Sequence, residues 1–182
     1  MRTILALLST TALIIMMTSI KATGNPPSSD RVNELIADWE RAKAFTKEYL
    51  EAMSDEGLSY RPTPEARSFA EQMLHLAMGN QGIVSTSLQK ERLFTENIEK
   101  SDQYKTREAL TKAVMESYDF VIASIKELND DQLKEKVKFF NGQEYTRETG
   151  LAKAFEHQTH HRGQTTIYLR MKGVTPPAEK LF

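Results

Sequence analysis

Apolar residues recur at intervals of three and four in four long stretches of the chain, which is the spacing of a helix that buries one face. The four predicted helices cover residues 30–53, 69–88, 107–128 and 147–172. In the third, for example, Leu110, Val114 and Val121 share one face. Because no stretch makes a convincing sheet, the pattern predicts an all-α protein with the architecture of a four-helix bundle.

Residues that start and stop helices support these boundaries. Ser68 and Glu71 match the S-x-x-E capping box, in which each side chain satisfies an unpaired amide at a helix start. Thr146 is placed to cap the fourth helix, and Gly173 is placed to end it in a left-handed conformation.

The segments between the helices are predicted to be irregular. Residues 90–105 are polar and are expected to form a long connection, and the run of residues 129–131 is expected to break the third helix. The pair Asn141-Gly142 lies between aromatic residues, which indicates a turn in a small hairpin or an ordered loop.

The first residues have the order of a secretory signal peptide. Met1-Arg2 gives a positive start, and residues 3–20 then carry no charge. The pattern predicts a cleaved signal peptide over residues 1–22, a linker over residues 23–29 and the helical domain over residues 30–182. Such a protein would be exported, periplasmic or secreted; an uncleaved segment would instead anchor it in a membrane.

Composition narrows the function classes. The chain has 24 Lys plus Arg against 25 Asp plus Glu, a balance that argues against a nucleic-acid partner. It has no cysteine, which excludes disulfides, iron–sulfur clusters and thiolate zinc sites.

The four histidines suggest a metal site. His157 and His161 are spaced i, i+4, so they share one face of the fourth helix, and the same stripe contains Ala154, Gln164 and Tyr168 and is flanked by Leu151, Phe155 and Ile167. If this stripe points inward, each unsatisfied imidazole costs roughly 1–3 kcal/mol of burial, which a divalent cation would remove. His75, in the middle of the second helix, is the candidate third ligand. The spacing alone leaves open that the histidines lie exposed on a polar face.

Several segments resemble the DinB family of metal-binding four-helix bundles, over about residues 30–180. The segments are FEHQTHHRGQ at residues 155–164, YLR at 168–170, Gly173 with Pro176-Pro177, His75-Leu76, and FFNG at 139–142. The resemblance implies that His75, His157 and His161 bind a divalent metal ion. It also implies a homodimer packed through helices.

Four residues near the candidate ligands are expected to support the site or the fold. His160 lies about 100° around the helix from His161 and is expected to support a ligand from behind or to pack between helices rather than to bind the metal. Arg162 is expected to make structural hydrogen bonds, and Gln164 to face bound water or substrate. Tyr168 is expected to belong to the core.

A site with three neutral imidazoles leaves the ion its full charge and leaves coordination positions open, which is typical of an enzyme. Zinc and nickel fit this donor set best; iron, whose usual histidine site includes a carboxylate, is a third option. The resemblance implies a thiol-dependent transferase acting on a small molecule, although export counts against it. Hydrolysis by a metal-activated water suits an exported protein better. No residue clearly supplies a general base, so no catalytic residue is assigned. The alternative is a non-catalytic bundle with a structural or sequestered ion.

Overall fold

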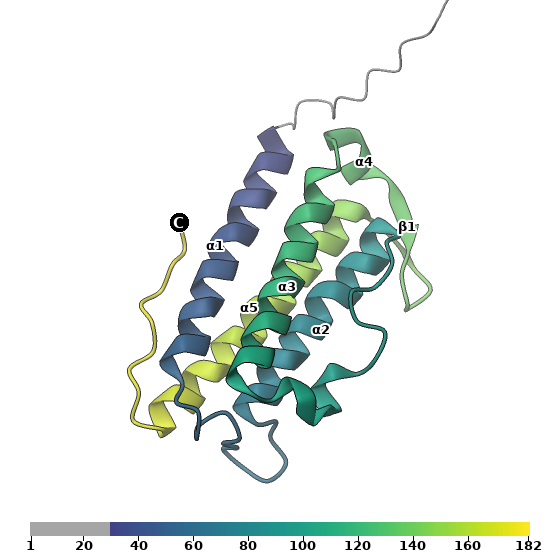
Figure 1. Cartoon of the computed structure of the whole chain (residues 1–182). Helices are drawn as coiled ribbons and strands as arrows, with labels where there is room; N and C mark the ends of the chain where they lie inside the picture. The colour runs from purple at the N-terminus through teal and green to yellow at the C-terminus, as the bar shows by residue number, and fades with distance from the viewer. Residues whose placement is uncertain (1–29) are drawn as a thin grey trace, which may run out of the picture.

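Four long helices run side by side in the computed structural model, which describes residues 30–182 (Figure 1). They are α1 (Asp30–Ala52), α2 (Phe69–Leu88), α3 (Arg107–Lys126) and α5 (Arg147–Met171). Helix α2 packs against both α5 and α3, and α1 packs against α3 and α5. The predicted four-helix bundle is confirmed, whereas the predicted signal peptide (residues 1–22) and linker (residues 23–29) lie outside the described residues.

Buried aromatic residues fill the middle of the bundle. The ring of Trp39 on α1 meets Tyr118 on α3 at 5.8 Å and Phe155 on α5 at 5.4 Å between centroids, both nearly edge to face. Trp39 and Tyr118 are fully buried. Edge-to-face pairs of this kind stabilise a core beyond the area that they bury, so these rings join three of the four helices.

The predicted caps at Ser68, Thr146 and Gly173 are confirmed. Ser68 Oγ accepts a hydrogen bond from the Glu71 amide at 3.2 Å, and the Glu71 carboxylate accepts one from the Ser68 amide at 2.9 Å. Thr146 Oγ1 accepts from the Thr149 amide at the start of α5. Gly173, with φ of +74°, ends that helix in the conformation that favours glycine.

The connections contain more structure than the hydrophobic pattern predicts. Two short 3₁₀ helices, η1 (Ile98–Lys100) and η2 (Asp102–Tyr104), interrupt the predicted irregular stretch at residues 90–105. Ile98 is fully buried and fastens η1 against α2. Helix α3 ends at Lys126, shortly before the predicted break at residues 129–131, and Asn129 caps a further short helix, α4 (Asp130–Lys134).

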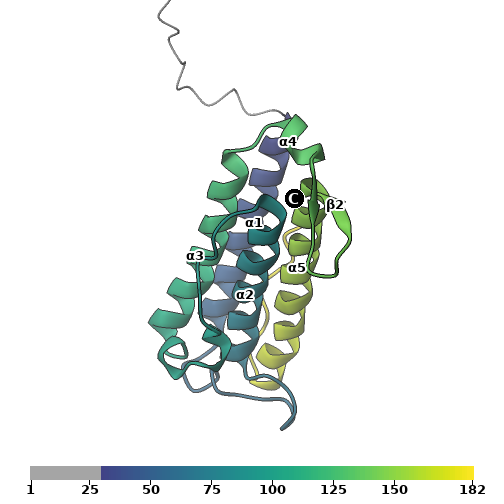
Figure 2. The same cartoon turned by 90° about the vertical axis from the view of Figure 1, so that its right-hand side faces the viewer.

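A small antiparallel hairpin precedes α5. Strand β1 (Lys136–Lys138) pairs with β2 (Glu144–Thr146), with Val137 opposite Tyr145. Gly142 in the connecting turn has φ of +81°. The hairpin prediction at this place is confirmed, and Figure 2 shows the hairpin lying beside the first turns of α5.

Within residues 30–182, none of the helices combines the length and apolar character that crossing a bilayer requires.

Candidate metal centre

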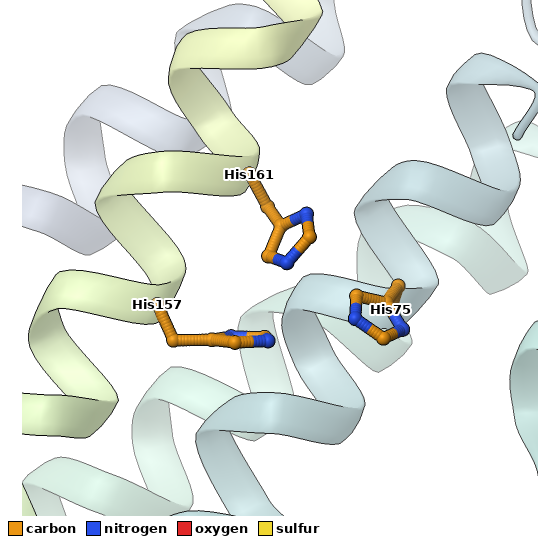
Figure 3. Close-up of side chains that lie close together, drawn as sticks. All are labelled: His75, His157 and His161. Carbon is orange, nitrogen blue, oxygen red and sulfur yellow. The ribbon is translucent and has the colours of Figure 1, made fainter. Parts of the chain in front are cut away.

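Three histidine rings from two helices converge in the groove between α2 and α5 (Figure 3). The ring of His75 lies 5.3 Å from that of His157 and 4.5 Å from that of His161, and the latter two lie 4.3 Å apart, between centroids. One ring nitrogen of each lies within 4.8 Å of the other two. The three residues predicted as ligands are therefore brought together, and this group could hold one metal ion.

The local sequence explains the convergence. His157 and His161 occupy successive turns of α5, so both rings project from one face. Gly79 lies one turn after His75 on α2, and a Cβ atom added there would lie 2.0 Å from Cε1 of His157. The missing side chain at position 79 thus leaves the space that the His157 ring occupies.

A buried carboxylate orients His75. The carboxylate is that of Glu99. His75 Nδ1 donates to Glu99 Oε2 at 2.9 Å, and Arg67 Nε donates to Glu99 Oε1 at 2.8 Å. Burial raises the pKa of Glu99, but the hydrogen bonds from Arg67 and His75 outweigh it and hold that pKa below its ordinary value. With its proton on Nδ1, His75 presents Nε2 as a lone pair toward the other two rings, an arrangement common behind metal-binding histidines.

Two glutamines flank His161. Gln72 Nε2 lies 2.9 Å from His161 Nδ1, Gln164 Oε1 lies 3.1 Å from the same atom, and the two glutamine side chains also contact each other. His161 Nδ1 accepts from Gln72 when it carries no proton and donates to Gln164 when it does; in the second tautomer Nε2 of His161 is free to bind a cation. The prediction that Gln164 faces the histidine site agrees with this contact.

His157 and His161 are both neutral at physiological pH. Burial, with a smaller effect from the positive charge of neighbouring groups, lowers the pKa of His157 to about 4 and that of His161 to about 3. His157 Nδ1 is also buried without a hydrogen-bond partner among residues 30–182. Neutral imidazoles with unsatisfied nitrogens are suitable ligands for a divalent cation, so these residues fit a metal ion. For His75, His157 and His161 the alternative of exposure on a polar face is wrong.

His160 does not belong to the converging group. Its ring meets that of His161 at 4.9 Å and nearly at a right angle, but the side chain is exposed. The expectation that it packs between helices is therefore wrong, because position 160 of α5 faces away from the bundle core. It contacts the ring of His161 from the side that faces solvent.

Arg162 is structural, as predicted. It is buried between α5 and α1, where Nη1 donates to Gln158 at 2.8 Å and to Thr46 at 3.4 Å. Its guanidinium also lies 4.6 Å from the centre of the Phe45 ring. The Arg162 guanidinium therefore has its partners between α1 and α5 and makes none of these contacts with the three histidines.

Tyr168 and Ile167, two further residues of α5 near the histidines, differ in burial. Tyr168 is buried, and its hydroxyl donates to the backbone oxygen of Arg67, which agrees with the predicted core role. Ile167 does flank the stripe but is 52% exposed, so the expectation that this flank points inward is wrong. It lies at the edge of the stripe, about 80° around the helix axis from His157.

A cavity of about 710 Å³ extends from the histidines toward the last turns of α5. His160, His161, Gln164 and Tyr168 line one side of it, and Gln72 of α2 and Glu99 of η1 line another. Charged side chains of both signs, among them Arg67 and Lys100, complete the wall. A small molecule that enters this cavity reaches His161 directly.

A family match covers the whole helical bundle, because residues 24–181 match the DinB family. The chain belongs to the DinB family. The family resemblance predicted from the histidine segment is thereby confirmed. No curated protein sequence matches this DinB-family chain.

Solved structures show the same fold. A DinB-like protein from Bacillus cereus ATCC 10987 has a TM-score of 0.72 at 21% identity and covers 81% of this chain and 97% of its own. The DinB-like protein YjoA from Bacillus subtilis has a TM-score of 0.62 at 21% identity, covering 82% and 97%. YfiT from Bacillus subtilis, described as a probable metal-dependent hydrolase with an unusual four-helix bundle topology, has a TM-score of 0.63 at 20% identity, covering 82% and 92%. At these identities the likeness establishes the fold of this DinB-family protein.

Sequence reasoning missed Glu99 and Gly79. Glu99 lies in a polar connection without periodicity, where nothing in the local pattern places a carboxylate beside His75. Gly79 is a helix-internal glycine, a position that glycine destabilises relative to alanine. That cost was the available signal that position 79 is required to be small.

Proposed function

We propose that this DinB-family protein is a metal-dependent enzyme of hydrolytic type, with His75, His157 and His161 as the ligands of one divalent ion. The observation that carries the proposal is the convergence of three imidazole nitrogens within 4.8 Å of one another. One of the three, His161, lines a cavity large enough for a small substrate.

The donor set favours catalysis over a purely structural ion. Structural zinc sites are usually closed by four protein ligands, whereas the described residues offer a group of three. A divalent ion held by three neutral ligands keeps its charge, lowers the pKa of water to about 7 and polarises carbonyl oxygens. Zinc or nickel suits such a donor set best, with iron as the third option.

The chain's own residues would position the ligands and the substrate. Glu99 holds the proton of His75 on Nδ1, so that Nε2 is available to the ion. Gln164, beside His161 on the cavity wall, is placed to orient a polar group of the substrate. Arg67 and Lys100 give one side of the cavity positive charges that can bind an anionic or carbonyl group.

A thiol-dependent transferase is the second candidate. The cavity carries charges of both signs, which would suit a low-molecular-weight thiol that is itself zwitterionic. The predicted signal peptide favours hydrolysis instead, because such thiols are cytoplasmic reagents. The description of YfiT as a probable metal-dependent hydrolase also supports the hydrolytic reading.

The test compares metal-free protein with protein reloaded with zinc or nickel, against a panel of small esters and amides. The proposal predicts turnover that depends on the added metal, is lost in His161→Ala and is kept in Gly82→Ala, which changes an open position of α2. Turnover that appears only when a small-molecule thiol is added, with consumption of that thiol, would favour the transferase. A bound ion that supports neither reaction would favour the non-catalytic alternative.

A further inference from the structure

A second, smaller pocket lies along the same groove, on the other side of the histidines from the large cavity. It has a volume of about 260 Å³ and lies where the hairpin meets α2 and α5. We call it the hairpin pocket. Its lining residues are Ile83, Phe139, Phe140, Asn141, Tyr145, Thr149, Gly150 and Lys153.

The hairpin pocket lies close to the metal centre along two helices. On α5, Lys153 lies four residues before His157, which is about 6 Å along the helix axis. On α2, Ile83 lies four residues after Gly79, whose backbone touches the His157 ring. A ligand bound at the histidines therefore needs to extend by little more than one helical turn to reach the pocket.

The polar groups around the hairpin pocket are already paired with one another. Lys153 donates to Glu156 at 2.7 Å, Thr149 bonds to Thr146 at 2.8 Å, and Asn141 donates to the Tyr145 hydroxyl at 3.1 Å. The pocket consequently offers an occupant carbon surface instead of free charge. An apolar group would gain from this surface.

An exposed aromatic ring stands at the entrance. Phe140 is 82% exposed, although the neighbouring Phe139 is buried. Gly150 also lines the pocket and packs tightly behind it, since a Cβ atom there would lie 2.5 Å from Cζ of Phe139 and 2.1 Å from Oγ of Ser87. An occupant would cover Phe140, which gives that exposed ring an apolar contact.

We propose that the hairpin pocket binds an alkyl or aryl group of a ligand whose polar end is bound at the three histidines. The inference rests on the proposed function and adds the substrate class: a small molecule with a metal-binding polar end and an apolar tail. The volume is sufficient, because an apolar cavity of about 150 Å³ already accommodates benzene.

A series of hydroxamates of increasing chain length tests this inference on the full chain reconstituted with Co²⁺. Acetohydroxamate should change the cobalt absorption spectrum by binding the ion. Lengthening the chain to hexano- and octanohydroxamate should raise affinity by roughly fourfold for each methylene that the pocket buries, and at least tenfold across the series.

Variants of Phe140 test whether the gain in affinity with chain length comes from the hairpin pocket. In Phe140→Ser the gain with chain length should shrink several-fold, and in Phe140→Leu it should persist. Leu181→Ser is the matched control, because Leu181 is also exposed and lies outside the hairpin pocket. The Leu181→Ser control should show the same increase of affinity with chain length as the wild type.

The outcomes separate this inference from the proposed function. If acetohydroxamate binds but longer chains bind no more tightly, or if Phe140→Ser leaves the series unchanged, the hairpin pocket is not the tail site. If cobalt binds but no hydroxamate alters its spectrum, the ion has no open position, and the proposed function fails together with the inference. If Phe140→Ser converts a dimer into a monomer in size-exclusion chromatography, a second copy covers the pocket and the inference is wrong.

Discussion

Gly79 on α2 lies directly against the imidazole of His157 on α5. A methyl group at position 79 would approach Nδ1 of that ring to 2.2 Å. Because the ring is the end of a side chain, it can rotate away without disrupting the helices. We expect Gly79→Ala to keep the fold and to weaken metal binding at least tenfold, measured by competition with a chelator of known affinity.

Gly82→Ala is the matched control for this substitution. The two glycines lie three residues apart on α2, but a Cβ atom at position 82 meets nothing within 4 Å. Alanine should stabilise the helix there by about 0.5–1 kcal/mol and leave the metal affinity unchanged. Equal losses of metal in both variants would show that the contact with His157 is not the cause.

The ligand assignment predicts an unequal effect of the four histidines. Alanine at position 75, 157 or 161 should remove most of the bound metal, because each substitution leaves two imidazoles. His160→Ala should retain most of it, since His160 is exposed and lies outside the converging group. Elemental analysis of the purified variants measures the difference. The assignment is wrong if His160→Ala abolishes binding while His161→Ala does not.

Glu99 is expected to act through His75 rather than to bind the ion itself. Glu99→Gln removes the negative charge that holds the proton on His75 Nδ1 and that pairs with Arg67. We expect metal affinity to fall by roughly 10–100-fold with the fold retained, as judged by circular dichroism and chelator competition. Glu96→Gln is the control, because Glu96 lies in the same connection and bonds to Tyr104 instead. If Glu99→Gln binds the metal as tightly as the wild type, Glu99 does not position His75 for metal binding.

The depressed pKa values of His157 and His161 predict how stability depends on pH. Histidine in the unfolded chain titrates near 6.5, whereas burial lowers the folded values to about 4 and about 3. Between pH 6.5 and 4 the unfolded chain binds more protons than the folded one. The free energy of unfolding of metal-free protein should therefore fall as the pH falls, by up to about 1.4 kcal/mol per pH unit for each residue.

Urea denaturation of the metal-free protein between pH 7 and pH 4.5 measures this dependence. The double variant His157→Gln with His161→Gln should lose markedly less stability on acidification than the wild type. Contributions from carboxylates such as Glu71, whose pKa of about 2 also favours the folded state above pH 4, are common to both proteins. Parallel pH profiles would mean that the two imidazoles are not held neutral by the fold.

The bundle and the histidine pair could be predicted because their signals are local. Helical periodicity, the Ser68 capping box and the i, i+4 spacing of His157 and His161 each depend on residues within one or two turns. The same kind of signal was present for α4. Asn129 and Gln132 form a capping box at its start, although the polarity of the run by itself predicts only a break.

The parts that could not be predicted depend on contacts between distant segments. Glu99 reaches His75 only because buried Ile98 fastens η1 against α2. The importance of Gly79 depends on which residue of α5 faces it, and helix spacing alone does not determine how two helices are aligned. Ile167 was misplaced for a related reason, because a cavity, not another helix, borders that edge of α5.

X-ray absorption spectroscopy of the metal-loaded protein tests the three-histidine centre most directly, because it counts the imidazoles bound to the ion. We expect three imidazole nitrogens, at about 2.0–2.1 Å if the ion is zinc, and at least one further oxygen that an added hydroxamate replaces. A first shell with fewer than three imidazoles, or one closed by protein ligands and unchanged by hydroxamate, would contradict an open three-histidine centre.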